Sequence, residues 1–168
     1  HMLQSVKNRL PLTRESILNY HFIALQHKPA WAGTIRHAQV IIRGNEEFTV
    51  AKPKEIGRLL DNLVQEYNAF FKGKRHPLEE ILDFAAYFHN EFHHIHPFFD
   101  GNSRITRLIT FHFLQMNNIP IFDIPLGMLE MYVFSTKGAK RRDDKNLSRV
   151  LQQIILYNLK TINGKLLG

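Results

Sequence analysis

The stretch His96–Arg107 reads HPFFDGNSRITR and comes directly after a long apolar helical pattern. Pro97 disfavours helix at the residue before it, so we expect the preceding helix to end at His96. Gly101 and Asn102 are the residues best able to adopt positive φ in a tight loop. A new helix is expected to begin at Asn102 or at the residue after it. The stretch therefore predicts a loop that wraps around a helix N-terminus.

The residues of this loop suit phosphate chemistry. A helix N-terminus has free N–H donors and a partial positive charge, so it binds anions. Arg104 and Arg107 are three apart and share one face of the first turns, where they can hold a polyphosphate. Asp100 is a hard oxygen ligand for Mg²⁺, and His96 can accept a proton at neutral pH. Together these groups indicate phosphoryl or nucleotidyl transfer.

Helical periodicity dominates the chain outside the loop. Apolar positions predict helices at about 53–71, 78–95, 103–117, 126–135 and 147–162. Another helix is expected after Thr13, which is a favoured N-cap residue. The helix at 103–117 is apolar almost all round, so we expect it in the middle of the core. One domain over residues 3–168 is expected, because His1 and Met2 resemble the remnant of an expression tag.

One segment breaks the helical pattern. Residues 34–50 are rich in β-branched side chains and contain Gly44 and Asn45 in their middle. Apolar runs on both sides of such a turn signal predict a β-hairpin. An isolated hairpin is not stable, so it must lie against the helical body. The expected fold class is therefore all-α, a helical bundle with a small β-hairpin before the catalytic loop.

The composition excludes several classes of protein. The chain has 168 residues, 44% apolar and 22% charged, and contains no cysteine, so neither disulfides nor thiolate metal sites can form. No apolar run approaches the length of a membrane span and no signal peptide is recognisable, so we expect a cytoplasmic protein without a membrane partner. The net charge of +7 indicates either a solvated basic surface or an acidic partner such as nucleotide phosphate. No nucleic-acid motif accompanies the charge, so nucleic acid is not an expected partner.

The sequence HPFFDGNSR with Arg107 resembles the signature of the Fic (Fic/Doc) family, H-P-F-x-[D/E]-G-N-G-R-x-x-R. Eight of the nine fixed positions match, and Ser103 stands where the family has its second glycine. The similarity extends over roughly residues 12–160, since the family's all-α bundle also carries a β-hairpin flap before the motif. The resemblance implies an enzyme, a protein adenylyltransferase that moves AMP from ATP onto a Ser, Thr or Tyr hydroxyl of a target protein. It makes His96 the general base, and it makes Asp100 the ligand of a Mg²⁺ ion that bridges the α- and β-phosphates.

The resemblance also implies which groups hold the nucleotide. The backbone amides of Gly101, Asn102 and Ser103 would form the anion site. Arg104 would clamp the outer phosphates, and Arg107 would support them.

Two further contacts follow from the resemblance. Tyr132 is the expected partner of the adenine. The flap, at Ile35–Ile42, is expected to pair with the target protein by strand addition and to aim its hydroxyl.

Many family members carry an inhibitory helix with the pattern [S/T]-x-x-x-E-[G/N], but no Ser or Thr here is followed four residues later by Glu. A separate inhibitory protein, an inhibitory helix outside this sequence, and the absence of such control all stay open.

Ser103 leaves the transferred group open. A serine keeps its backbone N–H and is favoured at a helix N-terminus, but it adds a Cβ and a hydroxyl beside the phosphates. Family members altered at this position include a phosphotransferase type that moves the γ-phosphate. The alternatives are therefore a kinase-like transfer, or a module that binds nucleotide or nucleic acid without catalysis.

Overall fold

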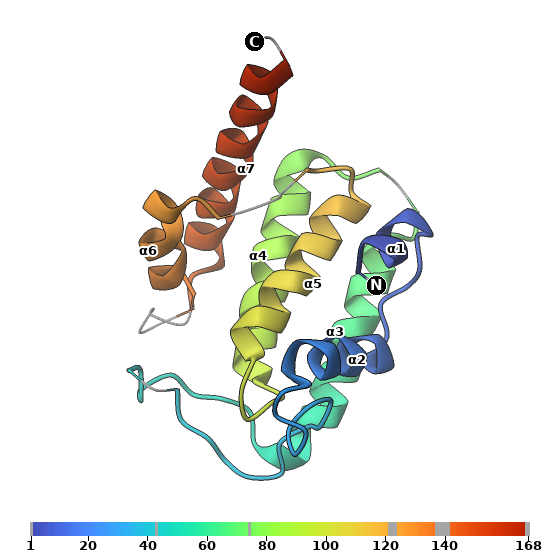
Figure 1. Ribbon diagram of the computed structural model, residues 1–168, viewed down its shortest axis with the longest axis vertical. Coiled ribbons are helices and arrows are strands. Elements are labelled where there is room, and N and C mark those ends of the chain that lie inside the picture. The colour runs from blue at the N-terminus through green and yellow to red at the C-terminus, as the bar shows by residue number, and fades with distance from the viewer. Residues whose placement is uncertain (1, 43, 74, 121–123, 137–141, 167–168) are drawn as a thin grey trace.

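The part of the chain that the structure describes is built from helices joined by loops (Figure 1). The structure is a computed structural model, and it describes residues 2–42, 44–73, 75–120, 124–136 and 142–166. In these ranges no β-strand is found, so the expected all-α class is confirmed. The elements in chain order are α1 (Met2–Lys7), α2 (Arg14–Leu25), the 3₁₀ helix η1 (Pro53–Glu55), α3 (Ile56–Phe70), α4 (Leu78–Ile95), α5 (Asn102–Met116), α6 (Leu126–Phe134) and α7 (Asp144–Leu166).

The helices α4 and α5 lie side by side in opposite directions at the centre of the molecule (Figure 1). Helix α4 also packs against α3 and α7, while α1 and α2 pack against α5. The apolar residues that recur every three or four positions point inward, as the period requires. Phe88 and Phe92 of α4 and Phe113 of α5 are fully buried among them. This packing holds the α4–α5 connection at one end of the bundle.

The polar side chains buried on α5 are hydrogen-bonded. The hydroxyl of Thr106 donates to the carbonyl of Asn102 at 2.8 Å, and the hydroxyl of Thr110 donates to the carbonyl of Thr106 at 2.8 Å. Nδ1 of His112 lies 2.6 Å from the hydroxyl of Tyr67. Buried polar groups that keep a partner avoid most of the cost of desolvation. The expectation that α5 lies in the middle of the core is confirmed.

Helix α2 begins with a reciprocal cap. The side chain of Thr13 accepts a hydrogen bond from the amide of Ser16 at 3.1 Å, and the Ser16 hydroxyl oxygen accepts one from the amide of Thr13 at 3.0 Å. These bonds satisfy donors that a helix start otherwise leaves open. The prediction of Thr13 as an N-cap is confirmed. The cap fixes where α2 starts, and α2 in turn packs on α5 beside the α4–α5 loop.

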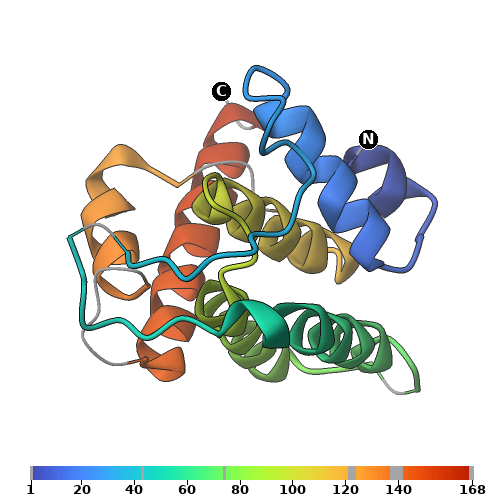
Figure 2. The ribbon, with the colours of Figure 1, turned by 90° about the horizontal axis from the view of Figure 1, so that it is seen from below.

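The structure corrects the prediction of a β-hairpin, because no strand is found in the described part of this region. Residues 34–52, which we call the extended segment, run without strand pairing in their described part, except for a single antiparallel bridge between Ile42 and Asn45. Backbone groups of the segment pair with the helical body instead. The amide of Arg36 donates to the carbonyl of Pro97, and the amide of Ala51 donates to the carbonyl of His94, both at 2.9 Å. Seen from below, the segment crosses the end of the bundle where α4 ends and α5 begins (Figure 2).

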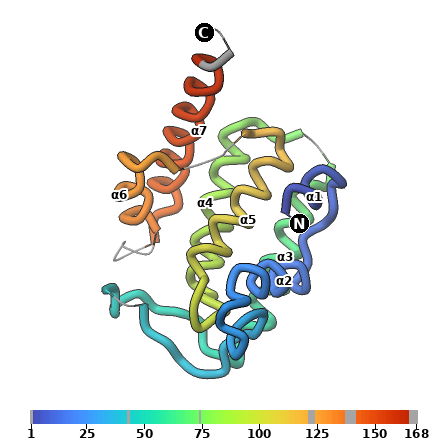
Figure 3. Tube along the Cα trace, viewed as in Figure 1, coloured from blue at the N-terminus to red at the C-terminus, as the bar shows by residue number. Residues whose placement is uncertain are grey.

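The two C-terminal helices lie on the other side of α4 from α3 (Figure 3). Helix α7 runs along α4, and α6 packs on α7. Leu147, Leu151 and Ile154 of α7 are fully buried, as the predicted period of this helix requires. None of the helices in the described ranges combines the length and the apolar character that a membrane span needs.

Candidate active site

The loop between α4 and α5 has the backbone shape that its sequence predicts. Helix α4 ends at Ile95, and His96 follows in the left-handed region with φ 47° and ψ 60°. Gly101, with φ 80°, turns the chain into α5, which begins at Asn102. A glycine is suited to this turn because it has no Cβ to clash at positive φ. A non-glycine residue such as His96 in this region needs support from its surroundings.

The side chain of Asn102 holds the loop closed. It is 4% exposed, its Nδ2 donates to the carbonyl of Phe98 at 2.7 Å, and its Oδ1 accepts from the amide of Phe98 at 3.0 Å. Phe98 is fully buried and fixes the loop to the core. The Asn102 side chain therefore shapes the loop, and only the backbone amide of this residue is left for an anion.

The N-terminus of α5 offers two open donors. The amides of Arg104 and Ile105 both reach the carbonyl of Gly101 at 3.0 Å, and the amide of Gly101 donates to Oδ1 of Asp100 at 2.6 Å. In the described part of the chain the amides of Asn102 and Ser103 have no acceptor. Such donors at the positive end of a helix dipole form an anion site. Two of the three predicted anion-site amides are thus available, while that of Gly101 is used by its neighbour.

A pocket of about 320 Å³ lies over this helix N-terminus. Its walls bring together residues from three segments, so the loop faces both the end of α4 and the extended segment. The lining residues are Ile41, Ile42, His93, His96, Phe99, Asp100, Gly101, Asn102, Ser103 and Arg104. Six of the eight predicted site residues share this pocket.

Arg107 and Tyr132 do not line the pocket. Tyr132 is 3% exposed, and its hydroxyl forms a short hydrogen bond with Nε2 of His89 on α4. Burial raises the pKa of Tyr132, and the positive charge of Arg107 opposes that shift. The ring is packed in the core, where its hydroxyl has a partner. The contact of Tyr132 with an adenine stays a prediction.

The imidazole of His96 is unprotonated at neutral pH, as a general base must be. Burial lowers its pKa, the backbone of His93 acts in the opposite direction, and the positive charge of Arg36 adds to the lowering, so that the pKa lies at about 4. The imidazole is therefore neutral at neutral pH and can accept a proton. His93 on the same helix, and Asp100 and Arg104 across the pocket, are the other ionisable groups of the pocket.

Asp100 is ionised and partly exposed. A hydrogen bond from Lys28 lowers its pKa, helped by the amide of Gly101 and the charge of Arg104. Nζ of Lys28 lies 2.6 Å from Oδ2, and the Arg104 guanidinium lies 3.7 Å from Oδ1. An ionised carboxylate beside an anion site fits Mg²⁺, which needs only one or two protein carboxylates when phosphates supply other ligands. Among the described residues, no three or more histidine, aspartate or glutamate side chains are placed so that they could hold a metal ion by themselves.

His21 on α2 supports the loop from behind, and the sequence reading missed it. Its Nδ1 accepts from the amide of Gly33 at 2.9 Å, so Nε2 carries the proton and donates to the carbonyl of Asp100 at 2.9 Å. Its ring stacks on Phe98 with centroids 3.7 Å apart. The sequence also did not predict the contact of Lys28 with Asp100. Both His21 and Lys28 lie more than 70 residues before Asp100, and no local pattern links residues so distant in the chain.

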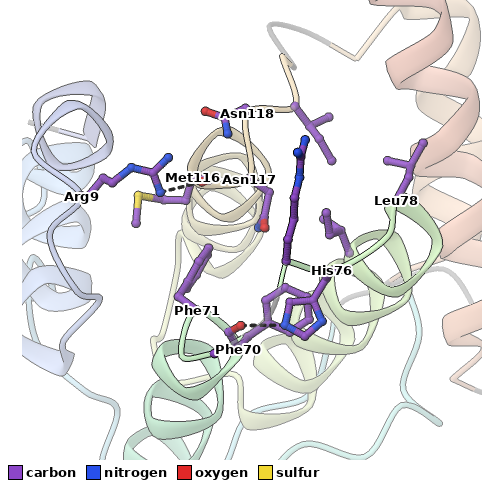
Figure 4. Close-up of a pocket in the computed structure, with 12 residues that line it drawn as sticks. Arg9, Phe70, Phe71, His76, Leu78, Met116, Asn117 and Asn118 are labelled. Carbon is purple, nitrogen blue, oxygen red and sulfur yellow. Dashed lines mark hydrogen bonds between the residues drawn. The ribbon is translucent and has the colours of Figure 1, made fainter.

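A larger cavity than this pocket lies near the other ends of α4 and α5, and Figure 4 shows residues that line it. It measures about 550 Å³ and is framed by the end of α3, the start of α4 and the end of α5. The rings of Phe70 and His76 stack within it at 3.9 Å, and Arg9 donates to the carbonyl of Met116 at 3.5 Å. None of the predicted site residues lines it, so its size does not indicate the chemistry of the loop.

Comparison with known proteins defines the class. The Fic/DOC family model matches residues 11–114, which include the loop and the first part of the bundle. The chain therefore belongs to the Fic/DOC family, and the predicted resemblance is confirmed.

Relatives with a curated name agree with this class. The "Protein adenylyltransferase Fic" of Drosophila persimilis is 29% identical over 148 residues, which are 88% of this chain and 28% of that protein. The protein of the same name from Drosophila willistoni is 28% identical over the same share of each chain. The chain thus spans less than a third of the length of these relatives.

Solved structures share the fold. Fic-1 from C. elegans has a TM-score of 0.79 at 22% identity, covering 98% of this chain and 49% of that one. BepC from Bartonella tribocorum, solved with bound AMPPNP, has a TM-score of 0.63 at 19% identity, covering 91% and 81%. These likenesses establish the fold of the Fic bundle for this chain.

Proposed function

We propose that this chain is a protein adenylyltransferase that moves AMP from ATP onto a hydroxyl of a target protein. The observation that carries the proposal is the pocket in which His96, Asp100 and Arg104 meet around the open amides of α5. Membership of the Fic/DOC family and the adenylyltransferase names of the relatives support the choice of reaction. The AMPPNP held by BepC supports an adenine nucleotide as donor.

The residues of the pocket suit each part of the transfer. His96, neutral at working pH, accepts the proton of the target hydroxyl as its oxygen bonds to the α-phosphorus. The bond from the α-phosphorus to the bridging oxygen breaks, and pyrophosphate leaves with the electron pair of that bond. The amides of Asn102 and Ser103 and the guanidinium of Arg104 stabilise the charge on the phosphate oxygens. Asp100 would hold Mg²⁺, which when bound neutralises phosphate charge.

We assign Arg107 to the outer phosphates as a supporting contact. It lies one turn beyond Arg104 on α5, so the two guanidinium groups share a helix face. Its positive charge acts on the Tyr132 hydroxyl, and Arg107 does not line the pocket. This role therefore needs its side chain to reach toward the pocket.

The target protein is proposed to dock on the extended segment at residues 35–42. Ile41 is 68% exposed and Ile42 lines the pocket, so this part of the segment borders the site of transfer. An extended chain without a strand partner can accept one from another protein. Backbone pairing there would bring a neighbouring Ser, Thr or Tyr hydroxyl close to His96.

The intact mass of the protein and of candidate target proteins after incubation with ATP and Mg²⁺ tests the proposal. A gain of one AMP, together with label transferred from the α-phosphate of ATP, is the expected result. A gain of one phosphate labelled only from the γ-position would instead support the kinase-like alternative that Ser103 raises. If the protein binds nucleotide but transfers nothing to any hydroxyl, the result would contradict both AMP transfer and phosphate transfer. It would then support the alternative of a non-catalytic binding module.

Replacing Ser103 with glycine is expected to raise the rate of AMP transfer. Ser103 lines the pocket beside the open amides, so its Cβ and hydroxyl crowd the phosphates. Relief of this crowding should be worth up to about 1.4 kcal/mol, a tenfold change in rate. Glycine in a helix should also lower stability by about 0.5–1 kcal/mol. Ser103→Ala is the matched variant, because it removes the hydroxyl and keeps the Cβ. A fall in rate with Ser103→Gly would mean that the hydroxyl assists the reaction.

Replacing Lys28 with methionine is expected to reduce the Mg²⁺ concentration needed for nucleotide binding. The Lys28 ammonium pairs with the Asp100 carboxylate, so it competes with a cation for that group. Both side chains are partly exposed, so the effect should be only about two- to fivefold. Binding of a fluorescent ATP analogue at graded Mg²⁺ measures it without any turnover. Lys54→Met, at an exposed lysine of η1, serves as the control. An unchanged or higher Mg²⁺ requirement would show that Lys28 does not compete.

A further inference from the structure

Arg36 is a buried cation that joins the extended segment to the catalytic loop. Its residue is 1% exposed. Nε donates to the carbonyl of His96 at 2.7 Å, and one terminal nitrogen donates to the carbonyl of Ala38 at 2.9 Å. The other terminal nitrogen donates to the carbonyl of Ala51 at 2.5 Å and reaches that of Ile95 at 3.4 Å. One guanidinium thus holds both arms of the segment and the end of α4.

The charge of Arg36 is balanced by carbonyl dipoles. Within the described ranges no carboxylate forms an ion pair with it, and burial lowers its pKa. A buried charge without an ionic partner is costly unless hydrogen bonds compensate it. Two of its acceptors, Ile95 and His96, lie at the C-terminus of α4, where the helix dipole is negative. A buried cation is therefore tolerated at the residue that carries the candidate base.

The bond to His96 supports an unusual backbone. His96 has φ 47°, a region that non-glycine residues enter only when surrounding contacts hold them there. The carbonyl of His96 bonds to the Arg36 side chain, and the carbonyl of the next residue, Pro97, accepts the amide of Arg36. Both bonds come from one residue of the extended segment, so a shift of the segment moves the backbone under His96.

We propose that Arg36 is a positioning residue that couples the extended segment, where a target protein would dock, to the placement and protonation of His96. This inference rests on the proposed role of His96 as the base. Pairing of a target with residues 37–42 would tighten the segment and, through Arg36, hold the imidazole in its working position. Loss of Arg36 would uncouple the extended segment from His96, so that the segment is less tightly held and the imidazole is displaced.

Two substitutions separate the charge of Arg36 from its geometry. Arg36→Lys keeps the charge but loses the planar fork, which alone can reach several carbonyls at once. Arg36→Met loses both. Arg14→Met is the control, because Arg14 bonds Asp61 at 2.6 Å between α2 and α3, away from the loop. Melting curves of all three variants establish which of them are folded.

The first readout is the titration of His96 by NMR in the nucleotide-free protein. In Arg36→Met the pKa of His96 should rise, because a positive charge near it is lost, while Arg36→Lys and Arg14→Met should leave it close to that of the parent protein. His93, Asp100 and Arg104 also face the pocket and are unchanged in all variants, so a difference reports Arg36. If Arg36→Met does not fold, Arg36→Lys decides the proposal through the second and third readouts.

The second readout is amide hydrogen exchange over residues 37–51, which should accelerate in both Arg36 variants and not in Arg14→Met. The third is kinetics: kcat for AMP transfer should fall at least about tenfold with KM for ATP nearly constant. An unchanged His96 titration in folded Arg36→Met, or unchanged exchange in either folded Arg36 variant, would overturn the proposal, whatever the melting temperature. The NMR and exchange readouts need no turnover, so absence of AMP transfer in the parent protein would contradict the proposed function and leave these two results standing.

Discussion

Replacing His96 with alanine is expected to reduce AMP transfer by about 10²- to 10⁴-fold, the usual contribution of a positioned general base. The burial that lowers the pKa of His96 to about 4 keeps the imidazole neutral, so the base is ready at physiological pH. Intact mass against time, with ATP and Mg²⁺ saturating, measures the loss. Nucleotide binding should change little, because the phosphates are held by the α5 amides and by Arg104.

The matched control for this substitution is His27→Ala, since His27 is an exposed histidine outside the pocket. It should retain the parent rate. The pH dependence gives a second check. Because protonated His96 cannot accept a proton, kcat/KM should stay level from neutral pH to about 5 and fall as the pH approaches 4. A His96→Ala protein that keeps more than about a tenth of the rate would contradict the general-base role.

Replacing Gly101 with alanine is expected to disrupt the loop and lower AMP transfer by about 10- to 100-fold. Gly101 has φ 80°, which is strained for a residue with a side chain, and the added Cβ would lie 3.2 Å from Nε2 of His21 and 3.2 Å from Cδ2 of Leu25. Strain alone costs about 1–3 kcal/mol. The displaced His21 would also lose its bond to the Asp100 carbonyl, and Asp100 would move with it.

Gly73→Ala separates backbone strain from the steric effect. Gly73 has φ 105°, and nothing lies within 4 Å of the position that its Cβ would take. This variant should lose stability from strain and keep the parent rate of transfer. Melting temperature and rate, measured for both variants, test the comparison. Equal rates for Gly101→Ala and the parent protein would mean that the contact of His21 with the loop does not matter for transfer.

Much of the fold follows from local rules that the sequence states directly. Amphipathic periodicity predicted α3 to α7, because their apolar faces must be buried wherever they pack, but it did not predict α1. Thr13 predicted the start of α2, and Pro97 predicted the end of α4, since capping and the pre-proline restriction act within a few residues. The loop from His96 to Arg104 was predictable for the same reason, because its residues are consecutive and a turn into a helix start brings them together.

The extended segment shows where local rules are insufficient. Its β-branched residues and Gly44 with Asn45 favour a hairpin. The sequence alone does not show the hydrogen-bond acceptors elsewhere in the fold that compete with strand pairing. In the folded chain the amides of Arg36 and Ala51 find acceptors on the end of α4, and the segment spreads along the body. The surroundings of Tyr132 were equally invisible in the sequence, since its hydroxyl bonds to His89 on α4 and its ring is buried in the core.

The sequence by itself determined the helical bundle, the motif and the backbone course of the loop, because periodicity, caps and turn residues act over short distances along the chain. Only the tertiary structure decided what surrounds that loop. His21, Lys28 and Arg36 bond to it from 60 to 79 residues away, so their roles depend on how α2 and the extended segment pack rather than on any local pattern. Packing also lowers the pKa of His96, because burial and a nearby guanidinium arise only when distant parts of the chain meet.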